Sequence, residues 1–169
     1  QKRSRLIWQR RVDNALIAEE PVEIIGKGNY EDARVFTHDG RNWLAFTEGF
    51  YDRKPFLAFQ QLARLGPDWQ PELKITIPFG GNGGRRSEKN WQFFSHEGKL
   101  HFVYSIVPHI VVELDAAFKP VKEYRSDIPL NWPWGDVLRG GTPPIRHQGV
   151  YITFFHSHTE HRAADRRYA

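Results

Sequence analysis

Residues 87–106, SEKNWQFFSHEGKLHFVYSI, hold two aromatic-rich runs on either side of a His96-Glu97-Gly98 turn. Short runs of this kind, joined by a turn that ends in glycine, predict a β-hairpin. The same arrangement occurs in residues 31–49, EDARVFTHDGRNWLAFTEG, and in residues 140–157, GGTPPIRHQGVYITFFHS. All three segments share a histidine two residues before the turn glycine and an aromatic residue six residues after it. These positions are His38, Gly40 and Phe46, then His96, Gly98 and Tyr104, then His147, Gly149 and Phe155. The chain therefore contains a repeated hairpin.

The spacing of the repeat indicates the architecture. The turn glycines are 58 and 51 residues apart, which leaves room for about four short strands per unit, as in a β-propeller blade. Because one small sheet cannot bury its own faces, we predict an all-β fold of the propeller type. Residues 1–169 are expected to form a single partial domain of about three blades, near residues 30–77, 87–125 and 139–169. Since the third unit has only two strands and the chain has no methionine, we expect a piece of a longer protein whose open edges favour self-association.

Composition narrows the class of protein. Hydrophobic residues make up 40% of the chain and aromatic residues 14%, which argues for a packed sheet protein and against disorder. The net charge of +4 comes from scattered arginines and lysines, so we expect a solvated surface or an anionic ligand, and no nucleic acid. The absence of cysteine excludes disulfides and thiolate metal sites and fits a cytoplasmic protein. No apolar segment reaches the roughly 20 residues of a membrane span, so no membrane partner is expected.

Outside the repeated turns, the pattern of apolar residues predicts further strands. The expected strands are residues 6–8, 33–37, 42–47, 56–62, 73–77, 91–95, 100–105, 109–114 and 121–124. Residues 15–22 fit either a strand pair or a loop. Further turns are expected around residues 52–54 and 66–68.

Two loops have a composition that fits ligand binding. Residues 78–87, PFGGNGGRRS, form either a flexible connection or a loop that closes over an anionic substrate. Residues 126–138 hold Trp132 and Trp134 among prolines, too many for a central strand. Their rings fit either the apolar face of a sugar or the hydrophobic gap between blades.

Three segments together resemble glycoside hydrolase family 130, the β-mannoside phosphorylases, hydrolases and their relatives. Residues 138–157, LRGGTPPIRHQGVYITFFHS, resemble a family signature in which glycines and a Pro-Pro pair lead into a strand that ends in a histidine. EDARV, residues 31–35, is similar to the family's Glu-Asp-Pro-Arg stretch, with Ala33 in place of proline. SEKNWQFFSHEGK aligns with the segment that carries the family's catalytic aspartate, and Glu88 occupies that position. The matches occur in family order and span roughly residues 30–157.

The resemblance implies a five-bladed β-propeller that cleaves β-mannosides by inverting phosphorolysis. Glu88 would be the general acid, in some relatives acting by relay through a sugar hydroxyl, and inorganic phosphate would be the co-substrate with no other cofactor. Glutamate is one methylene longer than the family's aspartate, which changes the position of the proton. The alternative for Glu88 is a buried carboxylate that ties strands together.

The resemblance and the residue types give a set of substrate-binding candidates. They are Glu31, Asp32, Arg34, Arg86, Lys89, Asn90, Trp91, Gly141, Thr142 and His156. Glu31, Asp32 and Arg34 fit either hydroxyl binding or an ion pair that pins the first hairpin. His156 fits either a donor to phosphate or sugar or a core histidine, and Arg146 is expected to point outward. His156, His158 and His161 lack partner carboxylates, so no metal site is expected.

Other functions fit the same resemblance. A β-mannoside hydrolase or a β-mannosyltransferase with an activated mannose donor would use the same fold. A carbohydrate-binding propeller without catalysis is the alternative from a different class. In each case the expected partner is an oligosaccharide or mannoside.

Overall fold

The computed structural model of the chain describes residues 6–24, 29–50, 57–80, 88–127, 129–135 and 137–159. Within these ranges the protein is all-β: fourteen strands form antiparallel sheets, and no helix is present. The expected all-β class is therefore confirmed. The chain divides into two compact units, Gln1–Lys89 and Asn90–Ala169.

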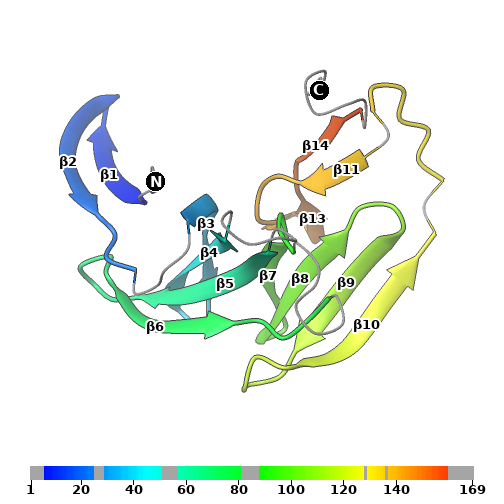
Figure 1. The fold of residues 1–169 in the computed structure, drawn as a ribbon, viewed down its shortest axis with the longest axis horizontal. Coiled ribbons are helices and arrows are strands. Elements are labelled where there is room, and N and C mark those ends of the chain that lie inside the picture. Colours follow the sequence, from blue (N-terminus) through cyan, green and yellow to red (C-terminus); the bar gives the residue numbers. More distant parts are fainter. Residues whose placement is uncertain are drawn as a thin grey trace. The chain divides into compact units, whose positions relative to one another are not determined.

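The first unit consists of a hairpin and a four-stranded meander (Figure 1). The hairpin strands are β1 (Ile7–Val12) and β2 (Ala15–Pro21), which settles the open assignment of residues 15–22 as one strand of a pair. The meander has the order β3-β4-β5-β6. Its strands are β3 (Asn29–His38), β4 (Arg41–Phe50), β5 (Leu57–Leu65) and β6 (Pro71–Thr76).

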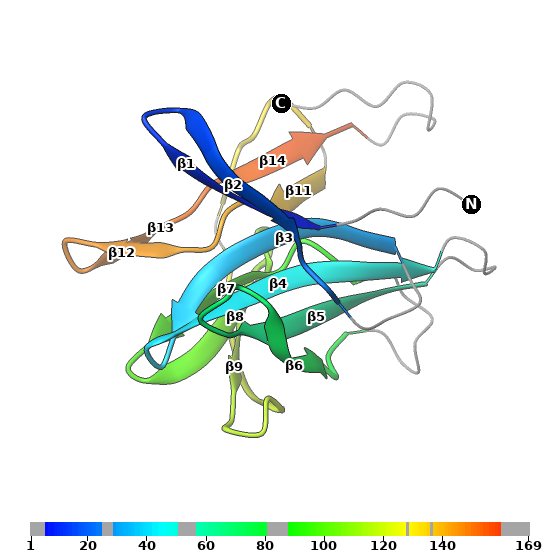
Figure 2. The ribbon, with the colours of Figure 1, turned by 90° about the vertical axis from the view of Figure 1, so that its left-hand side faces the viewer.

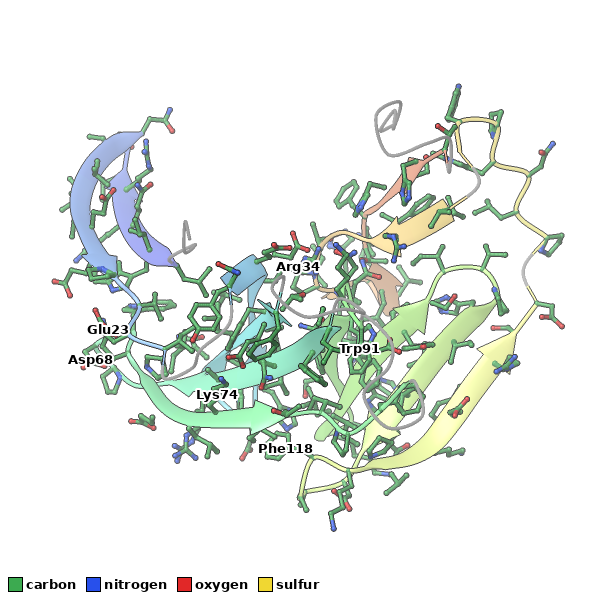
Figure 3. All side chains as sticks on the ribbon, viewed as in Figure 1. Glu23, Arg34, Asp68, Lys74, Trp91 and Phe118 are labelled. Atoms are coloured by element: carbon green, nitrogen blue, oxygen red, sulfur yellow. The ribbon has the colours of Figure 1, made fainter. Side chains whose placement is uncertain are left out.

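One face of this meander carries the core of the first unit. Leu44, Phe46, Ala63 and Leu65 form a buried cluster, and Leu6, Val22, Ile24 and Tyr30 pack against it. Gln70 joins the hairpin to the meander, because its side-chain oxygen accepts from the Glu23 N–H at 3.0 Å and its side-chain nitrogen donates to the Pro21 carbonyl at 3.1 Å. Figure 3 labels Glu23 and Asp68 at this junction.

The second unit has a meander with the same succession of strands. The order is β7-β8-β9-β10, and the strands are β7 (Gln92–His96), β8 (Lys99–Ser105), β9 (His109–Leu114) and β10 (Pro120–Ser126). Its core is aromatic: Trp91, Phe93 and Phe102 are buried, and the planes of Trp91 and Phe102 stack with centroids 4.5 Å apart.

Four short strands follow in the second unit. They are β11 (Val137–Gly140), β12 (Ile145–His147), β13 (Val150–Ile152) and β14 (Phe155–His158). Strand β11 pairs with β14, and β12 pairs with β13. The four strands are thus the two arms of one long hairpin that is interrupted on both sides, which the sequence pattern did not indicate. Pro143 and Pro144 lie in the interruption and have no N–H to donate to a ladder.

The three predicted turns are confirmed. Both central residues have positive φ, at 50° and 67° for Asp39-Gly40, 49° and 74° for Glu97-Gly98, and 48° and 84° for Gln148-Gly149. This is the conformation of type I′ turns, whose twist matches that of the strands they join. Asp13-Asn14 makes a further turn of this kind between β1 and β2. The expected turn around residues 52–54 lies outside the described residues.

In the described part of the chain, no helix is long and apolar enough to cross a membrane.

Candidate functional site

The three repeated hairpins are all distorted at the same position. Eight residues before the turn glycine stand Asp32 in the first hairpin, Asn90 in the second and Gly141 in the third. Asp32 and Asn90 have φ of 55° and 65°, which is unusual for residues other than glycine. Gly141 lies in the interruption between β11 and β12. All three are candidate substrate-binding residues, and each occupies the equivalent position of its own hairpin.

In the first hairpin the distortion is a β-bulge on strand β3. Glu31 is opposite Thr47 and Arg34 is opposite Ala45, so between these pairs β3 has two residues where β4 has one. In a regular strand, residues three apart point to opposite faces. The bulge therefore places Glu31 and Arg34 on the same face of the sheet.

Arg34 is half-buried on this face, on the edge strand β3 (Figure 3). Burial lowers the pKa of its guanidinium, and the charge of Asp32 opposes that shift. An arginine under these conditions stays charged at neutral pH, because its ordinary pKa is far above 7. The bulge therefore supplies a fixed cation beside carboxylate side chains.

The face that carries Glu31 also contains buried polar atoms that sequence analysis did not single out. Thr47 and Gln60 are directly opposite each other on β4 and β5, so Glu31, Thr47 and Gln60 form one row across the sheet. The Gln60 side-chain nitrogen donates to the Phe46 carbonyl at 2.9 Å. Among the described residues, Thr47 Oγ1 and Gln60 Oε1 are buried without a hydrogen-bond partner. An unsatisfied buried polar group costs about 1–3 kcal/mol, and an ordered water or a functional role is the usual explanation for one.

At Glu88 the chain is again hydrogen-bonded to the first meander. The Ile77 N–H donates to the Gln60 carbonyl at 3.3 Å, and the Glu88 N–H donates to the Ala58 carbonyl at 3.0 Å. The two ends of the segment from Ile77 to Glu88 are therefore hydrogen-bonded to carbonyls of β5 that are two residues apart. Glu88 and Lys89 are both half-buried. Arg86 and the rest of residues 81–87 lie outside the described residues.

Gly80 lies directly against the Glu88 side chain. Its φ is 95°, and a Cβ atom added there would overlap the Glu88 carboxyl group. Only glycine combines this conformation with this close approach. The candidate acid is therefore held against backbone.

Two candidates of the second unit have packing contacts. Trp91 is 1% exposed, and its ring also meets the edge of Tyr104, with centroids 5.6 Å apart. Asn90 is buried, and its carbonyl lies so close to Gly140 that a Cβ there would overlap it. These positions support the core of the unit rather than an open sugar platform.

Thr142 is tied into a hydrogen-bond network by Gln92. The Gln92 side-chain nitrogen donates to the carbonyls of Thr142 and Phe154, both at 2.8 Å, and to Thr153 Oγ1 at 2.6 Å. Thr142 Oγ1 accepts from the Phe154 N–H at 3.0 Å, and the Gly141 N–H donates to the Phe154 carbonyl at 2.9 Å. Gln92 therefore holds the interrupted hairpin against β7, a role that sequence analysis missed.

His156 and the two loop tryptophans lie in the last part of the second unit. His156 is half-buried opposite Arg139 in the β11–β14 pair. Trp132 donates to Ser157 Oγ at 2.7 Å and packs against Phe155, whereas Trp134 is 61% exposed. In this loop Trp132 is therefore packed within the unit, and Trp134 meets the Trp132 ring edge-on with centroids 4.9 Å apart while remaining largely exposed.

Histidine ligation of a metal was not expected, and no group of three potential ligands occurs among the described residues. His161 lies outside them. Arg146 is exposed, in line with the expectation that it points outward.

A polar cluster on the second meander was not anticipated. Glu113 is buried between Lys99 Nζ at 2.6 Å, the Tyr124 hydroxyl at 2.7 Å and His101 Nε2 at 3.6 Å. The hydrogen bond from Lys99, followed by that from Tyr124, lowers the pKa of Glu113 to about 2. Burial lowers the pKa of His101, which favours its neutral form. Both oxygens of the Glu113 carboxylate accept a hydrogen bond within the cluster. The role of the carboxylate is therefore to join strands β8, β9 and β10.

The candidates of the first unit do not all gather at one point. Arg34 is in register with Leu62 of β5, through Ala45, whereas Glu88 bonds to Ala58. Four residues of a strand span about 13 Å. Glu31 is closer to Glu88 along the strand, since its register partner on β5 is Gln60.

The sequence matches no protein-family model and no curated protein.

Proposed function

We propose that this chain belongs to a carbohydrate-active enzyme with a five-bladed β-propeller type of fold, which cleaves β-mannosides by inverting phosphorolysis. The observation that carries the proposal is irregular backbone at equivalent positions of the three hairpins, with positive φ at Asp32 and Asn90 and a break between strands at Gly141. The first hairpin has a bulge there, whereas in the other two the position precedes a strand or lies between two strands. Irregular backbone at equivalent positions is expected of equivalent blades, and bulges are common next to active sites. Two antiparallel four-stranded meanders support the same architecture.

Glu88 is the general acid in this proposal. Its carboxyl group is half-buried against Gly80, at the end of a segment pinned to β5. Phosphate attacks the anomeric carbon from the face opposite the leaving group, the glycosidic C–O bond breaks, and the Glu88 proton goes to the leaving oxygen. The products are α-mannose 1-phosphate and the shortened acceptor sugar.

Strand positions favour phosphate over activated water as the nucleophile. Glu31 is on β3, and Glu88 lies beyond β5, which puts their backbones about three strand spacings, or roughly 14 Å, apart. Inverting hydrolysis usually needs two carboxyl groups about 6.5–9.5 Å apart, which backbones at this separation allow only if both glutamate side chains extend toward each other. Phosphorolysis needs only one carboxylic acid, with cations for the phosphate. Lys89, which is half-buried and follows Glu88 in the chain, is closer to the acid than Arg34 and is the described cation of the first unit that best fits this role.

The test compares two glutamine variants in the full-length protein. Release of mannose 1-phosphate from β-1,4-mannobiose is measured with and without phosphate, in the parent, in Glu88→Gln and in the control Glu97→Gln. Glu97 is an exposed turn residue, with 82% of its side chain accessible. Since general acid catalysis contributes about 10²–10⁴-fold, Glu88→Gln should lower turnover by that factor while Glu97→Gln leaves it unchanged.

Each other outcome selects a different function. Full activity in Glu88→Gln removes the acid assignment. Turnover that is indifferent to phosphate favours a hydrolase, and turnover only with an activated mannose donor favours a transferase. Oligosaccharide binding without turnover in the parent identifies a carbohydrate-binding propeller.

A further inference from the structure

A groove runs between the β1–β2 hairpin and the four-stranded meander of the first unit. Figures 1 and 2 show the hairpin as a curved ribbon that leaves the meander at one end. The groove encloses about 820 Å³, within the range of about 300–1,000 Å³ that is usual for small-molecule sites. Neither Glu88 nor Arg34 lines it.

The two walls of the groove differ in chemistry. On the hairpin, Trp8 is opposite Glu20, and Arg10 lies two residues further along β1, so all three belong to one face. On the meander, Val35 is opposite Leu44, and both line the groove. Val35 is 48% exposed although it belongs to the apolar face of the sheet. The meander thus forms an apolar wall of the groove, and the opposite wall, on the hairpin, carries an aromatic ring and two charged side chains.

Trp69 stands at the rim of the groove on a rigid turn. The Gly66 N–H donates to the Gln70 carbonyl at 2.8 Å, the Trp69 N–H donates to the Gly66 carbonyl at 3.0 Å, and Asp68 Oδ1 accepts from the Gln70 N–H at 3.0 Å. Trp69 has a φ of 64° and is 39% exposed. The turn fixes the backbone while the large indole ring remains open to a ligand.

Charge indicates the kind of ligand. The groove is lined by one cation, Arg10, and two carboxylates, Glu20 and Asp68. This mixture gives no advantage to phosphate or to another anion, whereas side chains of both signs donate to and accept from hydroxyl groups. Two tryptophan rings supply apolar faces for C–H groups. A neutral polyhydroxylated ligand meets both requirements.

We infer that this groove binds a neutral oligosaccharide, at a site apart from Glu88. Trp8 and Trp69 cover the sugar rings, and Arg10, Glu20 and Asp68 bind their hydroxyl groups. The site holds a sugar chain without cleaving it, so it goes beyond the proposed phosphorolysis and does not depend on it.

The test is binding of β-1,4-mannotetraose, measured by calorimetry and tryptophan fluorescence in Glu88→Gln protein without phosphate, so that turnover is suppressed. Trp69→Ala should weaken binding roughly tenfold, at the upper end of what an aromatic contact contributes. Trp69→Tyr, which keeps an aromatic face, should stay within about threefold of its parent. Trp134→Ala is the matched control, because Trp134 is exposed in the second unit and does not line the groove. Affinity should not change between about 0.05 and 0.5 M NaCl, since the ligand is neutral.

Several results would overturn the inference. The first is an absence of saturable binding. The second is an affinity of Trp69→Ala equal to that of its parent, and the third is a loss of affinity in Trp134→Ala as large as the loss in Trp69→Ala. Near-UV circular dichroism of each variant shows whether a loss of binding is due to a loss of folding. If Trp69→Ala does not fold, the affinity of Trp69→Tyr is the deciding measurement. Failure of the proposed phosphorolysis is a different result, in which no mannose 1-phosphate is formed while binding still depends on Trp69.

Discussion

The two four-stranded meanders follow the same plan but fill their interiors differently. Both have a type I′ turn between their first two strands, and both join their last two strands by a turn with an aromatic residue at positive φ, Trp69 in one and Phe118 in the other. Even the hydrogen bonds of those last turns agree, since the Phe118 N–H donates to the Asp115 carbonyl at 3.0 Å as Trp69 does to Gly66.

The difference lies in the central strands. On its central strands the second meander has Phe102, on which Trp91 stacks, whereas the first has Thr47 and Gln60, which are buried with a side-chain oxygen that has no hydrogen-bond partner among the described residues. Aromatic stacking stabilises a sheet, while buried polar atoms without partners cost stability. The comparison teaches that the two interiors rest on different contacts, and we expect the aromatic core of the second meander to contribute more to stability than the mixed interior of the first.

Trp91→Ala is expected to have the largest effect on this comparison. Truncation of a fully buried aromatic residue costs about 3–5 kcal/mol in the free energy of unfolding. Urea denaturation followed by fluorescence measures the loss, and Trp134→Ala, at an exposed position, should change stability by about 0.5 kcal/mol or less. A stable Trp91→Ala protein with weakened sugar binding would instead make Trp91 a ligand platform.

Two buried glutamines give a second, smaller contrast. Gln92 donates to three acceptors, and Gln60 to one; among the described residues both have a buried side-chain oxygen without a partner. Replacing Gln92 by leucine leaves several groups unpaired and should cost about 2–3 kcal/mol. Gln60→Leu removes an unsatisfied oxygen along with one hydrogen bond, so its stability should change by about 1 kcal/mol or less. Equal losses in the two variants would contradict the expected difference between the two interiors.

The smallest expected effect is a pH dependence centred on Glu113. Its folded pKa of about 2 lies below the ordinary value of 4.5, so its contribution to stability is present above about pH 4.5 and is lost as the pH falls toward 2. The effect is small because Lys99, its main partner, is largely exposed to solvent. Thermal unfolding of the parent and of Glu113→Gln should therefore differ more at pH 6 than at pH 2.5. A constant difference would show that the carboxylate charge is irrelevant.

The sequence predicted the fold correctly at the turns, where the backbone conformation that a residue can adopt decides the structure. Asp39-Gly40, Glu97-Gly98 and Gln148-Gly149 identified the hairpins because type I′ turns require positive φ, which glycine adopts without strain. The four-stranded sheets followed from the spacing of these turns.

Positions that depend on pairing between distant strands could not be predicted. The bulge at Asp32 depends on the register between β3 and β4, and the same aromatic pattern suits Trp91 as a core residue or as a platform. Gln92 has no local partner, since its acceptors are 50 to 62 residues away. A usable signal was present for Thr47 and Gln60, which are polar residues inside the apolar runs of β4 and β5.

The anchoring of residues 77 and 88 on neighbouring carbonyls of β5 has a consequence for how this protein diversifies. The two ends of the intervening segment are fixed by the sheet, whatever the length of chain between them. Loop-closure entropy grows slowly, by about 0.6 kcal/mol for each doubling of length. We therefore expect an insertion after Gly80 to leave the strand register unchanged, so that ligand preference can be altered at this edge while the sheet beneath it stays the same.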